Sequence, residues 1–284
     1  MKTKGLVYRE KWQDLGFNKL FIGFKHFISS SEVECAHQCA EIIAQQLPDP
    51  IHVLDVGAGD GTVSLAFLEA LSQSRQVSSY TAIDISKELV KMLNSKKEAF
   101  KRYSENIRFS QEDATTFIPA RRPHLIVAFS SWFGMPIQEI SRYLSLFEPG
   151  GMLAITLSSK ASITIDLTIE YVEPMRSSEE VTEWLEAQEI YYVKYKIVSR
   201  DLERSNFLSG KNTHPEAETF FRYLLRRPLG AIGYIVPYLD QKPDLYFKTP
   251  KDLIILKEQE LESFASTTLS IVKHLITING GNKQ

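Results

Sequence analysis

The sequence predicts an α/β fold in which a doubly wound, mostly parallel sheet carries helices on both faces. Two observations lead to this prediction. From residue 51 to residue 158, short apolar runs alternate with segments whose apolar side chains recur every three or four residues, the order of successive strand–helix units. The first apolar run also leads straight into the turn Gly57-Ala58-Gly59-Asp60-Gly61 and then into a helix. Such units join parallel strands through right-handed crossovers.

The elements of this core follow one another regularly. Strands are expected at residues 53–56, 80–85, 107–110, 124–129 and 152–157. Three helices are expected between them, because three sets of apolar residues each share one helical face: Val63, Ala66, Phe67, Ala70 and Leu71; Leu89, Met92, Leu93 and Phe100; and Ile137, Ile140, Leu144 and Phe147. Glu148-Pro149-Gly150-Gly151 ends the last of these helices.

The second half of the chain predicts fewer elements. Ser177-Ser178-Glu179-Glu180 has the pattern of a capping box, and the apolar face of the helix after it contains Val181, Trp184 and Leu185. Further strands are expected at 190–199 and 253–256. A helical insertion is expected at 200–248 and a C-terminal helix at 258–278.

The composition limits the classes of partner. The 284 residues include 33 lysines and arginines against 35 aspartates and glutamates, so no strong net field attracts nucleic acid or an anionic membrane. No apolar run reaches the roughly 20 residues that a membrane-spanning helix needs. The two cysteines, Cys35 and Cys39, share a helical face, and with His37 they lack a second cluster that would complete a metal site. We expect a cytoplasmic protein without a metal, a nucleic-acid partner or a membrane partner.

The glycine-rich turn is the strongest candidate for a ligand site. Gly57, Gly59 and Gly61 allow backbone conformations closed to other residues and let the main chain approach a ligand closely. The helix after the turn directs its free amides toward the same place. A nucleotide-like small molecule is therefore the expected ligand.

Three acidic residues lie on or just after successive strands. Asp84 follows Gly59 by 25 residues, where a carboxylate can accept hydrogen bonds from ribose hydroxyls. Asp113 can accept from an exocyclic adenine amine, and Asp55 can orient the turn or meet a cationic group. Each acid alone is also a common cap or turn residue. Together they collect at the carboxyl ends of the strands, where ligands of open α/β sheets bind.

Four segments together resemble the motifs of class I methyltransferases that use S-adenosylmethionine. They are Val53 to Thr62, Ala82 to Ser86, Glu112 to Thr115, and Phe147 to Leu153. The resemblance covers about residues 51–158. It implies a Rossmann-like sheet of seven strands in the order 3-2-1-4-5-7-6, with the last strand antiparallel at 253–256. It also implies cofactor contacts at Asp55, Gly57, Ala58, Gly59, Gly61, Asp84, Ile85, Asp113, Ala114, Phe129 and Ser130. A nicotinamide site is the alternative, but Thr62 replaces the third glycine of that motif.

The flanking segments resemble, more loosely, the histamine N-methyltransferases. The similarity lies in Phe24-Lys25-His26-Phe27, in the acidic segment 29–34, and in the layout of residues 177–210. It implies that Glu34, or Glu32 in a shifted alignment, binds the substrate. The chain departs from this family at Ser130, where the family has a glutamine, and near Thr249, where it has an asparagine. Segment 158–168 also lacks the aromatic residues that the family has there.

We therefore expect an S-adenosylmethionine-dependent methyltransferase acting on a small molecule, most simply by N-methylation of an amine. Direct displacement at a sulfonium needs alignment and exclusion of water, so no catalytic residue is predicted. After the fourth strand, Ser131, Trp132 and Phe133 are expected to contact the substrate, and Met135 lies close by; the aromatic rings could equally cap the core. The alternatives are O-methylation, and a sensor or structural protein that binds the cofactor without transferring a methyl group.

This interpretation divides the chain into four parts. Residues 1–50 form an N-terminal helical cover, and residues 51–158 form the cofactor-binding Rossmann-like core. Residues 159–258 contain the substrate-side insertion and the final strands, and residues 259–284 contain the C-terminal helix and tail. The identity of the acceptor and the oligomeric state stay open.

Overall fold

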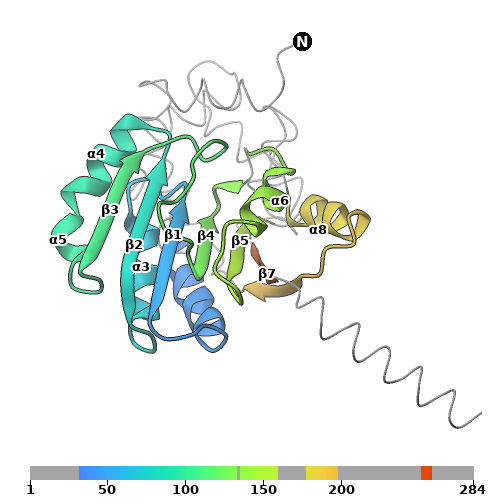
Figure 1. Cartoon of the computed structure of the whole chain (residues 1–284), viewed down its shortest axis with the longest axis horizontal. Coiled ribbons are helices and arrows are strands. Elements are labelled where there is room, and N and C mark those ends of the chain that lie inside the picture. Colours follow the sequence, from blue (N-terminus) through green and yellow to red (C-terminus); the bar gives the residue numbers. More distant parts are fainter. Residues whose placement is uncertain (1–31, 133–134, 159–176, 198–250, 258–284) are drawn as a thin grey trace, which may run out of the picture.

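A seven-stranded sheet forms the centre of the computed structural model, which describes residues 32–132, 135–158, 177–197 and 251–257 (Figure 1). The strands lie in the order β3-β2-β1-β4-β5-β7-β6. They are β1 Ile51–Val56, β2 Val77–Asp84, β3 Asn106–Gln111, β4 Leu125–Phe129, β5 Met152–Ser158, β6 Val193–Ile197 and β7 Lys251–Lys257. β7 is antiparallel to both neighbours, and all other pairs are parallel. The expected fold and strand order are confirmed.

Helices cover both faces of this sheet. They are α3 Thr62–Leu71, α4 Lys87–Ser95, α5 Lys97–Phe100, α6 Glu139–Leu144 and α8 Ser178–Ala187, preceded by a helix over residues 32–44. Figure 1 shows α4 and α5 beside β3 at one end of the sheet and α8 near β7 toward the other.

Two core clusters form because alternate side chains of a strand point to opposite faces. Val53 of β1 and Leu125 of β4 pack on one face with α3 and the helix of residues 32–44. Leu54 and Ile126, the next residues along, pack on the other face with α6 and α8. This coverage of both faces explains why the central strands are almost continuously apolar in the sequence.

The two cysteines pack in the core on one face of the helix of residues 32–44, as their spacing predicts. Cys35 and Cys39 are both buried in the cluster formed with α3 and the sheet. Ala36 and Ile43 complete the buried face of this helix at helical spacing.

Two predicted elements differ from the observed ones at turns without a glycine or proline signal. The helix expected over 89–100 is divided at Lys96, which ends α4 and begins α5 with φ −95° and ψ 4°. The strand expected from residue 190 begins only at Val193, because the chain is still leaving α8. Glu189 is left-handed there with φ 56°, and the Ile190 amide donates to the Leu185 carbonyl at 2.9 Å. This is a Schellman motif with glutamate in the position that glycine usually takes.

The other boundaries agree within a few residues. β2 begins at Val77 rather than at residue 80, because Val77 and Ser79 pair with β1, and Ser79 also pairs with β3. Ser177 caps α8 by accepting a hydrogen bond from the Glu180 amide at 3.3 Å, as the capping pattern predicts. The expected insertion at 200–248 and C-terminal helix at 258–278 lie outside the described residues. Within the described part of the chain, no helix is long and apolar enough to span a membrane.

Candidate functional site

The carboxyl ends of β2, β1 and β4 lie side by side and form the edge where the candidate site is built. Val56 pairs with Ile83, so the glycine turn after β1 lies next to Asp84 at the end of β2. On the other side of β1, Asp55 pairs with Val127 of β4, which brings the residues after β4 to the same edge. Ligands of open α/β sheets bind outside such strand ends.

The glycine turn has the conformation that the sequence predicts for close approach to a ligand. Gly57 and Gly59 have φ values of 74° and 61°, in the left-handed region that glycine adopts without strain. The amides of Gly57 and Ala58 both donate to the Ile83 carbonyl, at 2.8 Å and 3.1 Å, and tie the turn to β2. A Cβ at Gly57 would lie 2.4 Å from the Ser131 Cβ, so that position has no room for a side chain.

Asp84 holds this turn from the neighbouring strand. One of its carboxylate oxygens accepts a hydrogen bond from the Gly59 amide at 2.9 Å, and the other accepts from the Ser86 amide at 2.8 Å. The residue is 8% exposed. A carboxylate oxygen has a second acceptor position, so these bonds are compatible with the expected contact to ribose hydroxyls. Next to it, the Ile85 carbonyl accepts from the Gln111 side chain at 3.3 Å.

Asp55 lies in the core rather than in the ligand-facing turn. It is fully buried and accepts a hydrogen bond from the Tyr80 hydroxyl on β2. Burial, together with the charge of Asp55, raises the pKa of Tyr80 well above its ordinary value, so Tyr80 stays a donor. Of the two expected roles, orientation of the turn agrees with this position, and contact with a cationic ligand group does not.

A different support holds the start of α3. The Lys96 ammonium donates to Asp60 Oδ2 at 3.0 Å and to Thr62 Oγ1 at 2.7 Å, and Asp60 accepts from the Thr62 amide and hydroxyl. The sequence analysis missed Lys96, because it lies 34 residues beyond Thr62 and no local spacing links the two.

The segment after β3 places Asp113 and Ala114 at the same edge of the sheet. Asp113 Oδ1 accepts hydrogen bonds from the Thr115 amide at 2.9 Å and from the Thr115 hydroxyl at 2.8 Å, which forms a tight local turn. The Glu112 amide donates to the Asp84 carbonyl at 3.0 Å and joins the segment to the end of β2. The expected ribose and adenine residues are therefore neighbours.

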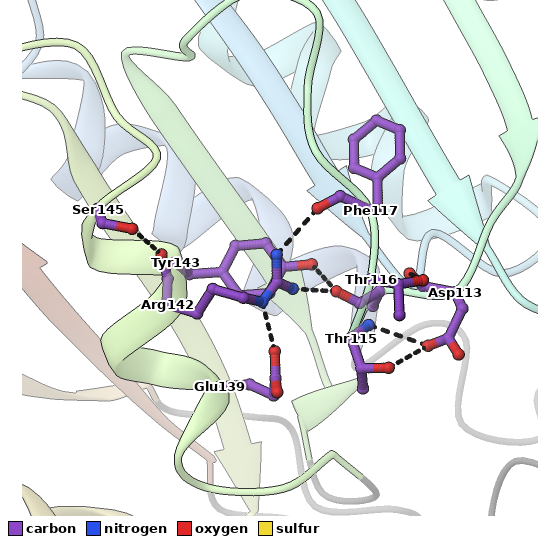
Figure 2. Close-up of polar contacts among 9 residues, drawn as sticks. Asp113, Thr115, Thr116, Phe117, Glu139, Arg142, Tyr143 and Ser145 are labelled. Atoms are coloured by element: carbon purple, nitrogen blue, oxygen red, sulfur yellow. Dashed lines mark hydrogen bonds and ion pairs between the residues drawn. The ribbon is translucent and has the colours of Figure 1, made fainter.

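Residues of α6 hold this segment from the other side (Figure 2). Arg142 donates to the carbonyls of Ala114 and Phe117, and the Tyr143 hydroxyl donates to the Ala114 carbonyl at 2.7 Å. Burial raises the pKa of Tyr143 to about 12, against the opposing effect of Arg142, so the hydroxyl remains protonated at neutral pH. Sequence analysis did not single out either residue.

Two residues after β4 lie between the glycine turn and β5. Ser130 is left-handed with φ 49°, and its amide donates to the carbonyl and the hydroxyl of Thr156 on β5. The Ser131 hydroxyl donates a hydrogen bond to the carbonyl of Val56, the residue before Gly57. Phe129, the last residue of β4, packs its ring on Phe67 of α3 with centroids 4.8 Å apart.

Glu32 is brought to this edge by the helix of residues 32–44. It is 7% exposed, and its carboxylate accepts a hydrogen bond from the Ser130 hydroxyl at 3.3 Å, across 98 residues of sequence. Glu32 precedes the buried Cys35 and Ala36 by three and four residues, and so lies on the same helical face. Glu34 lies off that face and is half-buried. Of the two predicted acids, Glu32 is the one that reaches Ser130.

Trp132, which the sequence predicts either to contact the substrate or to cap the core, lies in the core. The side chain is fully buried in the core cluster of α6 and α8, and its ring meets the Tyr143 ring edge-on at 5.3 Å. Its indole nitrogen is buried, and it has no hydrogen-bond partner among the residues that the structure describes. The alternative interpretation, in which the residue caps the core, agrees with this position. Met135 is half-buried against the same cluster, and Phe133 lies outside the described residues.

Within the described ranges, no group of three or more histidine, cysteine, aspartate or glutamate side chains could hold a metal ion. The polar groups at the sheet edge are backbone amides and hydroxyls, which donate hydrogen bonds, and the carboxylates of Glu32, Asp84 and Asp113, which accept them. Such a set suits an organic ligand that carries hydroxyl and amine groups.

Comparison with known proteins agrees with this arrangement. Residues 29–212, more than half of the chain, match the model of a methyltransferase-domain family. No curated protein matches the chain significantly. Among solved structures, magnesium protoporphyrin IX methyltransferase (ChlM) from Synechocystis PCC 6803, with bound SAH, aligns with a TM-score of 0.53 and 12% identity over 90% of this chain and 100% of its own.

Two further structures share the fold. The [4+2]-cyclase SpnF aligns with a TM-score of 0.52 and 18% identity over 78% of this chain and 80% of its own. The YcgJ protein from Bacillus subtilis aligns with a TM-score of 0.50 and 17% identity over 79% of this chain and 99% of its own. At these identities the likeness concerns the fold, and nothing in it supports the narrower resemblance to histamine N-methyltransferases. The family match over more than half of its length shows that the chain belongs to the methyltransferase-domain family.

Proposed function

We propose that the protein is an S-adenosylmethionine-dependent methyltransferase that N-methylates a small amine. The observation that carries the amine assignment is the buried Glu32 carboxylate beside Ser130, at the same sheet edge as the glycine turn. The cofactor assignment rests on the glycine turn itself, on Asp84 and on the segment of Asp113 and Ala114.

The residues present fit this cofactor. Gly57 lets the main chain pass close to Ser131, where a Cβ would clash. The left-handed Gly59 places its backbone amide beside the Asp84 carboxylate. Asp84 is the proposed acceptor for the ribose hydroxyls, and Asp113 with Ala114 is the proposed adenine site. When bound, S-adenosylmethionine supplies a methyl group on a positively charged sulfur. Gly61, Ile85 and Phe129 are proposed to surround the cofactor without donating to its reacting atoms.

Glu32 is proposed to receive the amine. An aliphatic amine is mostly protonated at neutral pH, whereas a methyl acceptor needs the nitrogen lone pair. A carboxylate in a mostly buried position can dock the ammonium ion and accept its proton, directly or through water. Ser130 donates to this carboxylate and fixes one of its oxygens. Ser131 remains a proposed contact on the same side, whereas Glu34 lies off the helical face that carries Glu32.

The test compares Glu32→Gln with Glu34→Gln, which makes the same chemical change two residues away. Both purified variants are assayed against a panel of small amines and of neutral hydroxyl compounds, with methylated products identified by mass spectrometry. Glu32→Gln should raise KM for the amine acceptor by about tenfold or more, the effect of losing one charge-assisted hydrogen bond. Glu34→Gln should stay within about threefold of wild type, a change of less than 1 kcal/mol. Equal KM values in wild type and Glu32→Gln would contradict the amine site.

O-methylation is the outcome if only the hydroxyl compounds are methylated. A protein that binds the cofactor without methyl transfer is a second candidate, because SpnF has this fold and is named a [4+2]-cyclase. Calorimetric binding of S-adenosylhomocysteine together with no product from either panel would favour that candidate.

A further inference from the structure

The segment of residues 112–117 is a loop that local turn bonds and a neighbouring helix hold together. It contains no strand or helix, and its local bonds include the Asp113–Thr115 turn and the bonds from the amides of Thr116 and Phe117 to the Asp113 carbonyl, at 3.0 Å and 2.9 Å. Loop backbone of this kind opens easily unless another element holds it. The placement of the proposed adenine site therefore depends on what packs behind it.

Arg142 provides that support with the geometry of its guanidinium group. Nη1 donates to the Phe117 carbonyl at 2.9 Å, while Nη2 donates to the Ala114 carbonyl, so one planar group bridges two carbonyls three residues apart (Figure 2). The contacts span 25 and 28 residues of sequence. A guanidinium offers several donors in a fixed plane, whereas a lysine ammonium carries its donors on one nitrogen and cannot reproduce two bonds from separate atoms of one plane.

The guanidinium is itself fixed in place. Its Nε donates to Glu139 Oε2 at 2.6 Å, one turn earlier on α6, and its central carbon lies 4.5 Å from the centre of the Tyr143 ring. The Arg142 side chain is only 28% exposed, so these contacts are partly shielded from water. Tyr143 adds a second donor to the Ala114 carbonyl at 2.7 Å. Arg142 and Tyr143 of α6 thus donate to the loop, and Glu139 holds Arg142 in place.

We propose that Arg142, supported by Glu139 and Tyr143, is a positioning residue that holds residues 113–117 in the conformation that recognises the adenine base. The inference rests on the adenine site put forward under the proposed function. It does not depend on the methyl acceptor. A loop that is held in its binding conformation before the ligand arrives binds more tightly, because less ordering remains to be done on binding. Loss of Arg142 should therefore reduce affinity and adenine selectivity, although Arg142 itself is not assigned a contact with the ligand.

The experiment measures two dissociation constants by calorimetry, with no acceptor present. The ligands are S-adenosylhomocysteine and S-inosylhomocysteine, which has a carbonyl oxygen in place of the exocyclic amine. Wild type should prefer the adenine compound by about tenfold, roughly one hydrogen bond. Arg142→Gln and Arg142→Lys should each weaken binding of S-adenosylhomocysteine by about tenfold and bring the preference close to one. Tyr143→Phe removes one hydroxyl and should show a smaller loss in the same direction.

Arg122→Gln is the matched control, since Arg122 also donates to a carbonyl, that of Phe147, but outside the 112–117 segment. It should leave both dissociation constants unchanged. A merely structural role for Arg142 would weaken both ligands equally and keep the preference, which would overturn the inference. Retention of wild-type affinity by Arg142→Lys would overturn it as well, because charge alone would then suffice. If Arg142→Gln does not fold, Tyr143→Phe decides: it must lose part of the preference.

The outcomes also separate this inference from the proposal on which it rests. A wild-type protein that binds both ligands equally would remove the adenine assignment of Asp113 and Ala114, and the positioning role would be lost with it. A wild-type preference that persists in Arg142→Gln would remove only the positioning role. An error about the amine acceptor would affect neither measurement.

Discussion

Replacement of Gly57 by alanine should be far more damaging than its size suggests. Gly57 has φ 74°, and a left-handed conformation costs a residue with a Cβ about 1–2 kcal/mol. The new Cβ would also lie 2.4 Å from the Ser131 Cβ and 2.9 Å from its Oγ. Relief of such overpacking costs about 1–3 kcal/mol more. Gly57→Ala should therefore lower the free energy of unfolding by about 2–5 kcal/mol, the sum of these two costs.

Gly150→Ala separates the two costs. Gly150 has nearly the same φ, 76°, but a Cβ there meets no atom within 4 Å. Urea denaturation followed by circular dichroism should give a loss of only about 1–2 kcal/mol for this variant, the conformational cost alone. Ser131→Gly should recover part of the loss in Gly57→Ala by removing the atoms that clash, in a double-mutant cycle. Equal losses in Gly57→Ala and Gly150→Ala, or no coupling to Ser131, would refute the steric argument.

Two further predictions concern residues away from the site. Burial lowers the pKa of His52, and the charges of Arg121 and His124 lower it further, whereas the charge of Glu148 raises it. Because the pKa is lowered in total, the folded protein prefers the neutral ring. The neutral ring should contribute fully to the free energy of unfolding above the ordinary pKa of 6.5, and this contribution should be lost as the pH falls from 6.5 toward the folded pKa. The urea midpoint should therefore fall less between pH 7.5 and pH 5.5 in His52→Gln than in wild type. An unchanged fall would contradict the assignment. Glu189→Gly should raise the free energy of unfolding by about 0.5–1 kcal/mol, because the left-handed residue after α8 would lose its strain; a lower thermal midpoint than wild type would show that the glutamate side chain contributes more than the backbone costs.

The sequence predicts those features of the fold that depend on local pattern. Alternation of apolar runs with helical faces locates the strands of the core, and the motif resemblance supplies the order of all seven strands. The positions of Asp84 and of Asp113 with Ala114 at neighbouring strand ends also follow from that spacing. These predictions succeed because a strand end and the turn after it are set by residues close together in the chain.

Features that depend on distant partners could not be predicted in this way. The burial of Trp132 depends on Tyr143, and the orientation of Asp55 toward the core depends on Tyr80 of the next strand. Arg142 shows only an ordinary spacing of three from Glu139 in the sequence, and its bridge to the 112–117 segment requires the packed α6. The late start of β6 depends on a glutamate in a left-handed conformation, which no sequence pattern indicates.

The burial of both thiols on the helix of residues 32–44 has a practical consequence. Cys35 and Cys39 are the only cysteines of the chain, and a reagent can reach them only when this helix separates from the core formed with α3. The rate at which the native protein reacts with a thiol reagent therefore measures how often that separation occurs. Because Glu32 lies on the same helix, the natural cysteines can report the opening and closing of the proposed amine site without an introduced label.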